Sequence, residues 1–171
     1  MGCLSIANEE IMINPDVDIK RKALFCHNKY RRNHNLNKDL IITEDLCEKA
    51  KKKISKLIEK DDDELLDNKD EEELGENLYI NYQGSFDVEK ICESWYNEKN
   101  KYDFSKNKYQ KGTGHFTQMI WKETKKVGFG WDKSKDNKIY FLAYYYPAGN
   151  EIGKFKENVL VEKKSQEENG I

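Results

Sequence analysis

Two β-rich segments near the end of the chain limit the fold most strongly. Residues 125–133 read KKVGFGWDK and residues 138–149 read KIYFLAYYYPAG. Both are rich in aromatic and β-branched residues, which favour strands, and only the polar stretch SKDNK connects them. We therefore expect an antiparallel hairpin, which ends at Pro147 and Gly149. The stretch 76–82, ENLYINY, is a third strand candidate.

The earlier part of the chain has helical periodicity instead. The range 17–34 predicts a helix whose inner stripe recurs every three or four residues, at Ile19, Ala23, Cys26, His27, Tyr30 and His34. A second helix should begin at Thr43, whose hydroxyl can cap it, and Glu44 and Asp45 suit its positive end. Its buried side would consist of Leu46, Ala50, Ile54, Leu57 and Ile58.

A third helix is expected over 87–101, with Asp87 as its cap. Its inner face would carry Val88, Ile91, Cys92 and Trp95. Helices first and strands later predict an α+β domain with helices packed on a small sheet. The length of 171 residues suits one domain, and the 20 aromatic residues argue against general disorder.

Charge is unevenly distributed along the chain. The net charge is −2, but the segment 59–74 holds ten acidic residues and two lysines, which leaves the remainder at +6. The acidic segment is most simply a solvated loop. The basic clusters KRKALFCHNKYRR and KKKISK could face an anionic membrane. No nucleic-acid-binding motif accompanies them, so we expect no nucleic-acid partner.

Four cysteines, Cys3, Cys26, Cys47 and Cys92, are widely separated and lack the spacing of zinc fingers or of thioredoxin-like motifs. Their even number permits two disulfides. However, the first residues, MGCLSIANEEIMINPD, have neither a basic region nor a long apolar stretch, which predicts that no secretory signal peptide is present. We therefore expect reduced cysteines in an intracellular protein.

The N-terminus carries a candidate lipidation signal. Gly2 would be exposed after removal of Met1, next to the thiol of Cys3, so myristoylation and palmitoylation are both candidates. The usual pattern has Ser or Thr at the position of Ile6, and an unmodified N-terminus is the alternative. One acyl chain binds a bilayer only marginally, so Cys3 or the basic surface would have to supply the second attachment.

Two polar residues could form a site. His115 lies between a glycine-rich turn and an apolar run, in a predicted helix that ends before Gly128. Phe116, Ile120 and Trp121 in that run are interpreted as core. Counting on from Trp95, Glu98 lies on or beside the inner face of the third helix, where a carboxylate needs a partner. An ordinary solvated glutamate at a helix end is the alternative.

Five blocks in order then resemble one family. HNKYRRNH, GENLY, WYNEKNKYDF, GTGHFTQMIWKETKKVGFG and YYYPAGN are similar to the signature blocks of the CAP superfamily of cysteine-rich secretory, antigen-five and pathogenesis-related proteins. With FKENVL, they resemble most its intracellular Golgi-associated plant pathogenesis-related branch, in which the N-terminal glycine is myristoylated. The resemblance implies a three-layer α-β-α sandwich with a small antiparallel sheet. It covers residues 17–161, between an N-terminal segment 1–16 and a polar tail 162–171, with 59–74 as an insertion.

The resemblance also implies a cleft lined by two histidines and two glutamates. Glu76, Glu98 and His115 match three of them, but the acidic stretch before Glu76, where the other histidine is expected, contains none. The family's first-helix histidine has a structural role, so His27 is interpreted as packed and hydrogen-bonded. Glu76, Glu98 and His115 could hold a divalent metal only weakly, because zinc favours several imidazole or thiolate ligands. We therefore expect no required cofactor.

Three functions remain open. The first is a non-enzymatic protein on the cytoplasmic face of Golgi-like membranes, which binds a sterol, a fatty acid, an anionic phospholipid or an unknown protein partner, and which could form a homodimer. The second is a secreted venom-allergen-like effector. The third is a metal-dependent hydrolase, which is disfavoured because the sequence lacks a recognisable hydrolase motif and a nucleophile beside the Glu–His pair.

Overall fold

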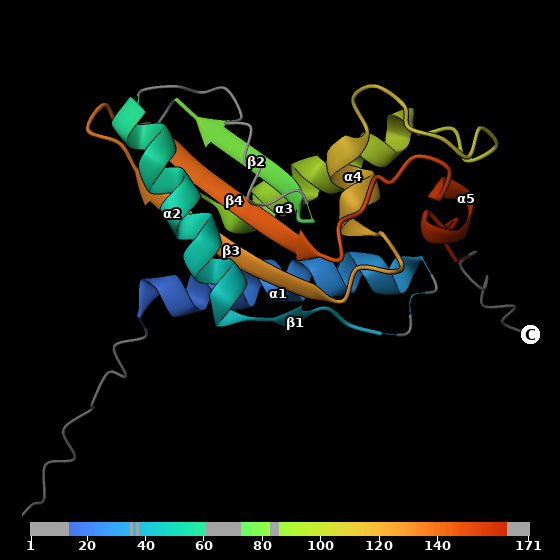
Figure 1. Ribbon diagram of the computed structural model, residues 1–171, viewed down its shortest axis with the longest axis horizontal. Coiled ribbons are helices and arrows are strands. Elements are labelled where there is room, and N and C mark those ends of the chain that lie inside the picture. Colours follow the sequence, from blue (N-terminus) through green and yellow to red (C-terminus); the bar gives the residue numbers. More distant parts are fainter. Residues whose placement is uncertain (1–13, 35, 37, 61–72, 83–85, 164–171) are drawn as a thin grey trace, which may run out of the picture.

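The computed structural model describes residues 14–34, 36, 38–60, 73–82 and 86–163. Its helices are α1 (Pro15–Asn33), α2 (Glu44–Lys60), α3 (Val88–Asn97), the 3₁₀ helix η2 (Glu98–Lys101), α4 (Gly114–Met119) and α5 (Phe155–Asn158). Its strands are β1 (Ile41–Ile42), β2 (Gly75–Asn81), β3 (Lys126–Lys133) and β4 (Ile139–Tyr146). The strands form a single sheet that lies between helices (Figure 1).

The sheet has the strand order β1-β3-β4-β2. The predicted hairpin is confirmed, since β3 and β4 pair antiparallel with Lys126 opposite Tyr146. The third predicted strand, β2, pairs antiparallel with the other edge of β4. The short strand β1 was not expected from the sequence; it pairs parallel with β3 and makes the sheet mixed rather than purely antiparallel.

Helices cover both faces of this sheet, so the predicted three-layer α-β-α sandwich is confirmed (Figure 1). Alternation along β4 divides the core into two clusters. On one face, Tyr140, Leu142 and Tyr144 pack against the apolar stripe of α2. On the other face, Phe141, Ala143 and Tyr145 pack in the cluster that contains residues of α1, α3 and α4. Because β4 is buried on both faces, it is a continuous run of apolar and aromatic residues.

Helix ends follow local chemistry. α1 begins at Pro15 rather than at residue 17, because Asn14 caps it by accepting the backbone N–H of Asp16 at 3.0 Å and proline is favoured in the first turn. The predicted cap of α3 is present, since Asp87 accepts the N–H groups of Glu89 and Lys90. The expected single helix over 87–101 changes to a 3₁₀ helix at Glu98.

α2 lies directly on β3 because two glycines leave room for it. A Cβ atom on Gly128 would lie 2.3 Å from the carbonyl carbon of Leu46, and one on Gly130 would lie 2.7 Å from the backbone nitrogen of Lys51. Neither position can hold a side chain unless the helix moves away from the strand. These two glycines therefore set the distance between the helix and the sheet.

Several expectations lie outside the described residues. These are the lipidation sites Gly2 and Cys3, most of the acidic segment 59–74 and most of the tail 162–171. Within the part of the chain that is described, no helix combines the length and the apolar character needed to span a membrane.

Candidate functional site

Glu98 and His115 form a direct pair at the junction of η2 and α4. The Nδ1 atom of His115 lies 2.7 Å from Oε1 of Glu98. The side chain of Glu98 is 19% exposed and that of His115 is 39% exposed, so the pair is reachable from solvent. The ring of His115 also stacks on Trp95, with ring centroids 5.7 Å apart. Of the two alternatives for Glu98, the structure therefore shows the inward, partnered carboxylate.

The second oxygen of Glu98 holds the start of α4. Oε2 accepts the backbone N–H of His115 at 3.0 Å and that of Phe116 at 3.2 Å. Free N–H groups at a helix start favour an anion, and α4 has only six residues to stabilise it. Three donors thus surround one carboxylate, which fixes the imidazole relative to the helix.

A chain of hydrogen bonds connects this helix to α1 through the sheet. Nδ2 of Asn77 donates to the carbonyl of His115 and to the hydroxyl of Tyr145, each at 3.1 Å. That hydroxyl lies 2.7 Å from Nε2 of His27, whose Nδ1 lies 2.7 Å from the carbonyl of Ala23. A neutral His27 satisfies both contacts, with its Nδ1–H donating to Ala23 and its Nε2 accepting from Tyr145. Complete burial lowers the pKa of His27 to about 4, in agreement with a neutral ring.

Arg31 holds the segment that follows α4. This guanidinium is only 1% exposed, and it donates to the carbonyls of Met119, Trp121 and Thr124 at 2.8–3.1 Å. Burial lowers the pKa of Arg31 to about 10, so the group remains charged at neutral pH. A cation at the carbonyl end of a helix is favourable. The α1 helix therefore contacts α4 through Arg31 at one end and through the His27 chain at the other.

Glu76 points away from this pair. It lies opposite Tyr144 in the sheet, and Tyr144 packs in the cluster on the α2 face. Its carboxylate lies 3.6 Å from Nζ of Lys53, a residue of α2 that is almost fully buried. The next residue, Asn77, contacts the His115 side because successive side chains of a strand leave opposite faces. The structure thus brings together Glu98 and His115, and it places Glu76 in a separate ion pair.

The described residues do not fit a zinc site. Across 14–34, 36, 38–60, 73–82 and 86–163, no three His, Cys, Asp or Glu side chains converge so that they could hold a metal ion. The Glu98–His115 pair offers one imidazole and one carboxylate, fewer ligands than zinc usually takes from a protein. The ammonium of Lys53 already neutralises Glu76.

The surroundings of the His115 ring decide whether it could activate a side-chain nucleophile. Among the side chains that the structure describes, no serine or threonine hydroxyl and no cysteine thiol hydrogen-bonds to the His115 ring. Activation of a nucleophile requires such a contact or one close to it. The contacts that the pair does make position the start of α4 and leave the His115 ring partly exposed.

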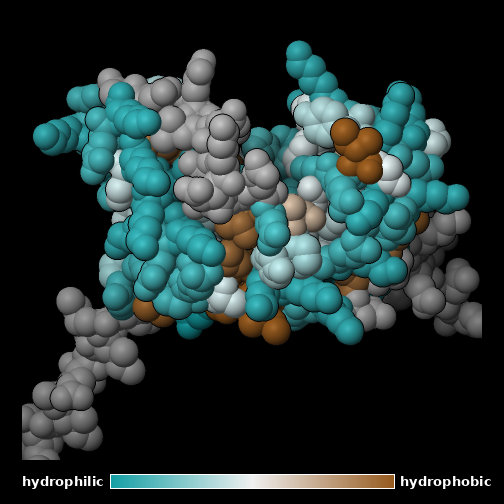
Figure 2. All heavy atoms as spheres, viewed as in Figure 1, coloured by the Kyte–Doolittle hydropathy of each residue, from teal (hydrophilic) through white to brown (hydrophobic). Residues whose placement is uncertain are grey.

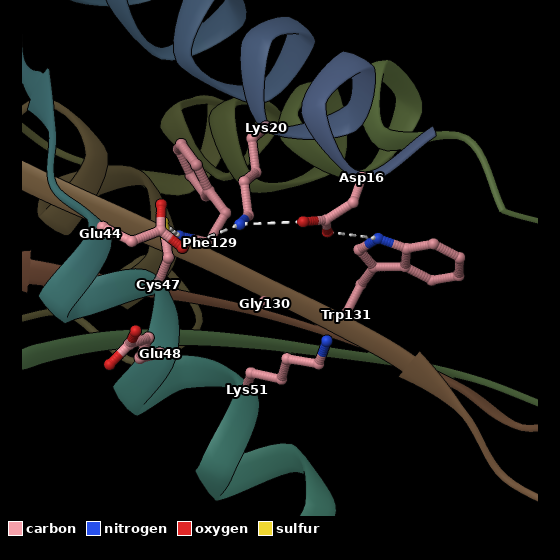
Figure 3. Close-up of a pocket in the computed structure, with 9 residues that line it drawn as sticks. All are labelled: Asp16, Lys20, Glu44, Cys47, Glu48, Lys51, Phe129, Gly130 and Trp131. Atoms are coloured by element: carbon pink, nitrogen blue, oxygen red, sulfur yellow. Dashed lines mark hydrogen bonds and ion pairs between the residues drawn. The ribbon is translucent and has the colours of Figure 1, made fainter. Parts of the chain in front are cut away.

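A hollow of about 200 Å³ lies between α1, α2 and β3, away from the Glu98–His115 pair (Figure 3). Lys20 bridges Asp16 at 2.9 Å and Glu44 at 3.6 Å, and the indole N–H of Trp131 donates to Asp16. Burial raises the pKa of the Cys47 thiol, which also lines this hollow. Of these contacts, the Lys20–Glu44 ion pair joins α1 to α2, and the others join α1 to β3 or lie within α1.

Sequence reasoning missed three polar residues on which this arrangement depends. Arg31 falls on the predicted stripe of the first helix, between His27 and His34. Lys53 falls likewise on the stripe of the second, between Ala50 and Leu57. A cation on an apolar stripe was the available signal for both. Asn77 could have been found from strand alternation, since it faces opposite to Glu76.

Comparison with known proteins gives a consistent result. The family model described as the cysteine-rich secretory protein family, CAP, matches residues 24–146. The Golgi-associated plant pathogenesis-related protein 1 of Homo sapiens is 34% identical over 149 residues, which cover 84% of this chain and 93% of that protein. Venom allergen 5 of Polistes gallicus is 38% identical over 96 residues, or 50% of this chain and 46% of that protein.

Among solved structures, the crystal structure of NaASP2 with Zn²⁺ matches with a TM-score of 0.65 at 22% identity, and the match covers 95% of this chain and 92% of that one. The zinc in that structure is a property of NaASP2. The predicted family is confirmed, both by the family model and by a relative that aligns along most of its length: the chain belongs to the CAP family.

Proposed function

We propose that this chain is a non-enzymatic CAP-domain protein that associates with membranes and binds lipid, with or without a protein partner. The observation that carries this proposal is the outward face of α1. Phe25 is 61% exposed and Val17 is 56% exposed on this face. The basic side chains of Arg21, Lys22, Lys29 and Arg32 surround them.

Two carboxylates offset part of this charge. Asp18 pairs with Arg21 at 3.0 Å and with Lys22 at 2.8 Å, and Asp39 pairs with Arg32. Glu89 of α3 also acts on Lys22, so four cations face three anions and the face keeps a positive excess. Among the described residues no carboxylate forms an ion pair with Lys29, whose ammonium lies over the ring of Tyr30. Exposed apolar side chains within a basic surface suit the headgroup region of an anionic bilayer.

A groove at the end of β4 has a different character. It measures about 530 Å³, within the usual range of ligand pockets, and is lined by Glu73, Tyr146, Pro147, Ala148, Gly149 and Glu151. Two carboxylates at its wall repel a phospholipid headgroup or a fatty-acid carboxylate. An uncharged ligand such as a sterol suits this groove better, while anionic headgroups suit α1. The face of the molecule shown in Figure 2 is mostly hydrophilic, with small separate hydrophobic areas.

The site favours binding over turnover. Three donors already surround the Glu98 carboxylate, so a proton-transfer role would require it to give up the start of α4. We therefore propose that the Glu98–His115 pair has a structural role, in which it holds α4 in place near the groove at the end of β4. We propose that this role requires no metal.

The proposed location takes its support from the relative whose alignment covers 84% of this chain. The name of the human relative refers to the Golgi, whereas venom allergen 5 is named as a venom protein. We propose the intracellular, peripheral location, with acylation at Gly2 and support from Cys3. Cell fractionation of wild type and Gly2→Ala tests the anchor, and equal membrane fractions would exclude it. Counting free thiols in the denatured protein from its native source tests the secreted alternative, for which disulfides are expected.

Sedimentation with vesicles tests the α1 face without acylation. Full-length protein made without an acyl chain should bind phosphatidylcholine vesicles that contain phosphatidylserine, and should not bind phosphatidylcholine alone. Phe25→Ala combined with Lys29→Glu should weaken binding by about tenfold or more, because each basic residue near an anionic surface contributes about 1 kcal/mol. The matched control, Ile152→Ala with Lys135→Glu, removes an exposed apolar residue and makes the same charge reversal elsewhere, and it should bind like wild type. Equal binding of both variants would contradict the proposal.

A further inference from the structure

The strand β2 forms one edge of the sheet. It is the last strand in the order β1-β3-β4-β2, and it pairs with β4 over its whole length (Figure 1). Among the described residues, no strand pairs with the other side of β2. The backbone groups on that side are therefore available to a strand from another molecule.

The hydrogen bonds of the neighbouring strands show which backbone groups of β2 point outward. At β3, the carbonyls of Lys125 and Val127 accept from β1, so the even-numbered residues of β3 bond to β4. By the register of the sheet, the odd-numbered residues of β2 then bond to β4. The N–H and C=O groups of Leu78 and Ile80 consequently point away from the sheet, and no hydrogen bond to them occurs within the described part of the chain.

This edge does not carry the usual protection of an edge strand. Lysine, proline and bulges commonly prevent edge-to-edge pairing. The sequence of β2, GENLYIN, contains neither lysine nor proline, and its register with β4 is unbroken. Leu78, Tyr79 and Ile80 are each partly exposed, and Tyr82, directly after the strand, is 63% exposed. An apolar edge of this kind suits the addition of another strand.

The charges along the edge favour a second copy of this chain as that partner. Glu76 lies near the start of β2, whereas at the other end the ammonium of Lys138 lies 5.4 Å from the ring centroid of Tyr82. Antiparallel pairing of two β2 strands brings the acidic start of each strand to the basic end of the other. Parallel pairing in register would instead place two copies of Glu76 side by side. The edge is therefore complementary to itself in the antiparallel direction.

We propose that β2 is a dimerisation edge, at which two copies of this chain pair antiparallel about a two-fold axis at Tyr79. Leu78 then lies opposite the partner's Ile80, and each of the two equivalent pairs exchanges two N–H···O bonds. The two four-stranded sheets become one continuous sheet. The lipid-binding proposal does not depend on this pairing, which uses no residue of α1.

The apolar side chains also match in this register. Leu78 and Ile80 both pack beside the cluster on the α2 face, so their cross-strand contact extends that cluster into the partner. Tyr79 packs beside the cluster on the opposite face and would meet the partner's Tyr79 there. An edge contact of this size suits a weak, reversible dimer.

Sedimentation velocity tests the edge in the full chain made without an acyl chain. Between about 10 μM and about 1 mM, wild type should show monomer and dimer in exchange. Ile80→Pro removes an outward N–H but no bond to β4, a position at which edge strands tolerate proline. It should raise the dissociation constant about tenfold or more, because each protomer loses a donor. The matched control, Ile80→Val, keeps the N–H and should associate like wild type.

Disulfide trapping tests the register. Tyr79→Cys in a Cys3→Ser background, oxidised with copper phenanthroline, should give a linked dimer, because residues opposite each other in a non-hydrogen-bonded pair have Cα atoms about 4.5 Å apart. The matched control, Ile80→Cys, should not link, because its Cα would lie more than about 7 Å from that of the partner's equivalent residue.

Three outcomes would overturn the proposal. The first is a monomer at every concentration, which would leave the edge to an extended segment of a different protein. The second is a dimer that Ile80→Pro does not weaken, and the third is equal linking of Tyr79→Cys and Ile80→Cys. Circular dichroism of each variant verifies that the fold persists before association is compared.

Discussion

Acidification should destabilise this protein through His27. The ring is completely buried, and this burial lowers its pKa in the folded protein to about 4, from the ordinary histidine value of 6.5. The unfolded chain therefore binds a proton at a pH at which the folded chain does not, and stability is lost as the pH falls from 6.5 towards about 4. A difference of about 2.5 pKa units corresponds to about 3.4 kcal/mol in total, of which about 2 kcal/mol is lost between about pH 7.5 and about pH 5.

Urea denaturation at these two pH values measures the effect. His27→Gln is the matched control, because its amide can also donate to Ala23 and accept from Tyr145 without titrating. The variant should be less stable than wild type at neutral pH, but its loss on acidification should be smaller by about 2 kcal/mol. The chain has only three histidines, so ring NMR signals can also follow His27 directly. An equal loss in both proteins, or a His27 signal that titrates near pH 6.5, would refute the assignment of the acid sensitivity to this ring.

Three further results are expected. Glu98→Ala removes the acceptor of three hydrogen bonds and should lower the free energy of unfolding by about 2–4 kcal/mol. Glu98→Gln keeps an oxygen for the N–H groups of His115 and Phe116 and should lower it by about 1 kcal/mol. Similar losses in the two variants would show that the carboxylate does not hold α4. Gly128→Ala should lower the free energy of unfolding, measured by thermal denaturation, by about 3 kcal/mol or more, because its Cβ would overlap the backbone of α2. The control Gly114→Ala, whose Cβ would have its nearest neighbour at 3.6 Å, should change it by less than about 0.5 kcal/mol. A small loss of stability in Gly128→Ala would mean that α2 is free to move away from the strand. A chelator should leave the melting temperature unchanged, and a drop after chelation would reveal a metal that the described residues do not account for.

Much of the fold could be predicted because its elements have strong local signals. β3 and β4 are long, β-rich and joined by a short polar connection, so pairing follows from the chain itself. The inner stripe of α2 is likewise evident, and Leu46, Ala50, Ile54 and Leu57 are all buried. β1 has two residues, too few for a periodicity, and it becomes a strand only because β3 lies beside it. Non-local pairing of that kind has no signature in its own residues.

The site was less accessible to sequence reasoning. The Glu98–His115 contact could be anticipated from the position of Glu98 on the helix stripe and from the family motifs. The position of Glu76 could not be anticipated, because motif matching ignores which face of a strand a residue occupies. Glu76 lies on the α2 face of the sheet, beside Lys53, and the Glu98–His115 pair lies on the opposite face. Arg31 and Asn77 were missed because a pattern of apolar residues does not indicate where buried backbone carbonyls need donors.

The two faces of α1 have different tasks. The residues of α1 that face solvent carry the basic and aromatic groups, and its opposite side carries Arg31 and His27. A rotation of α1 about its own axis would detach a guanidinium from three carbonyls at once, so the helix is held in one orientation. A surface docked on Phe25 and Lys29 consequently meets a pre-oriented template rather than a helix that must first adjust. Attachment there should be fast and should cost little ordering entropy.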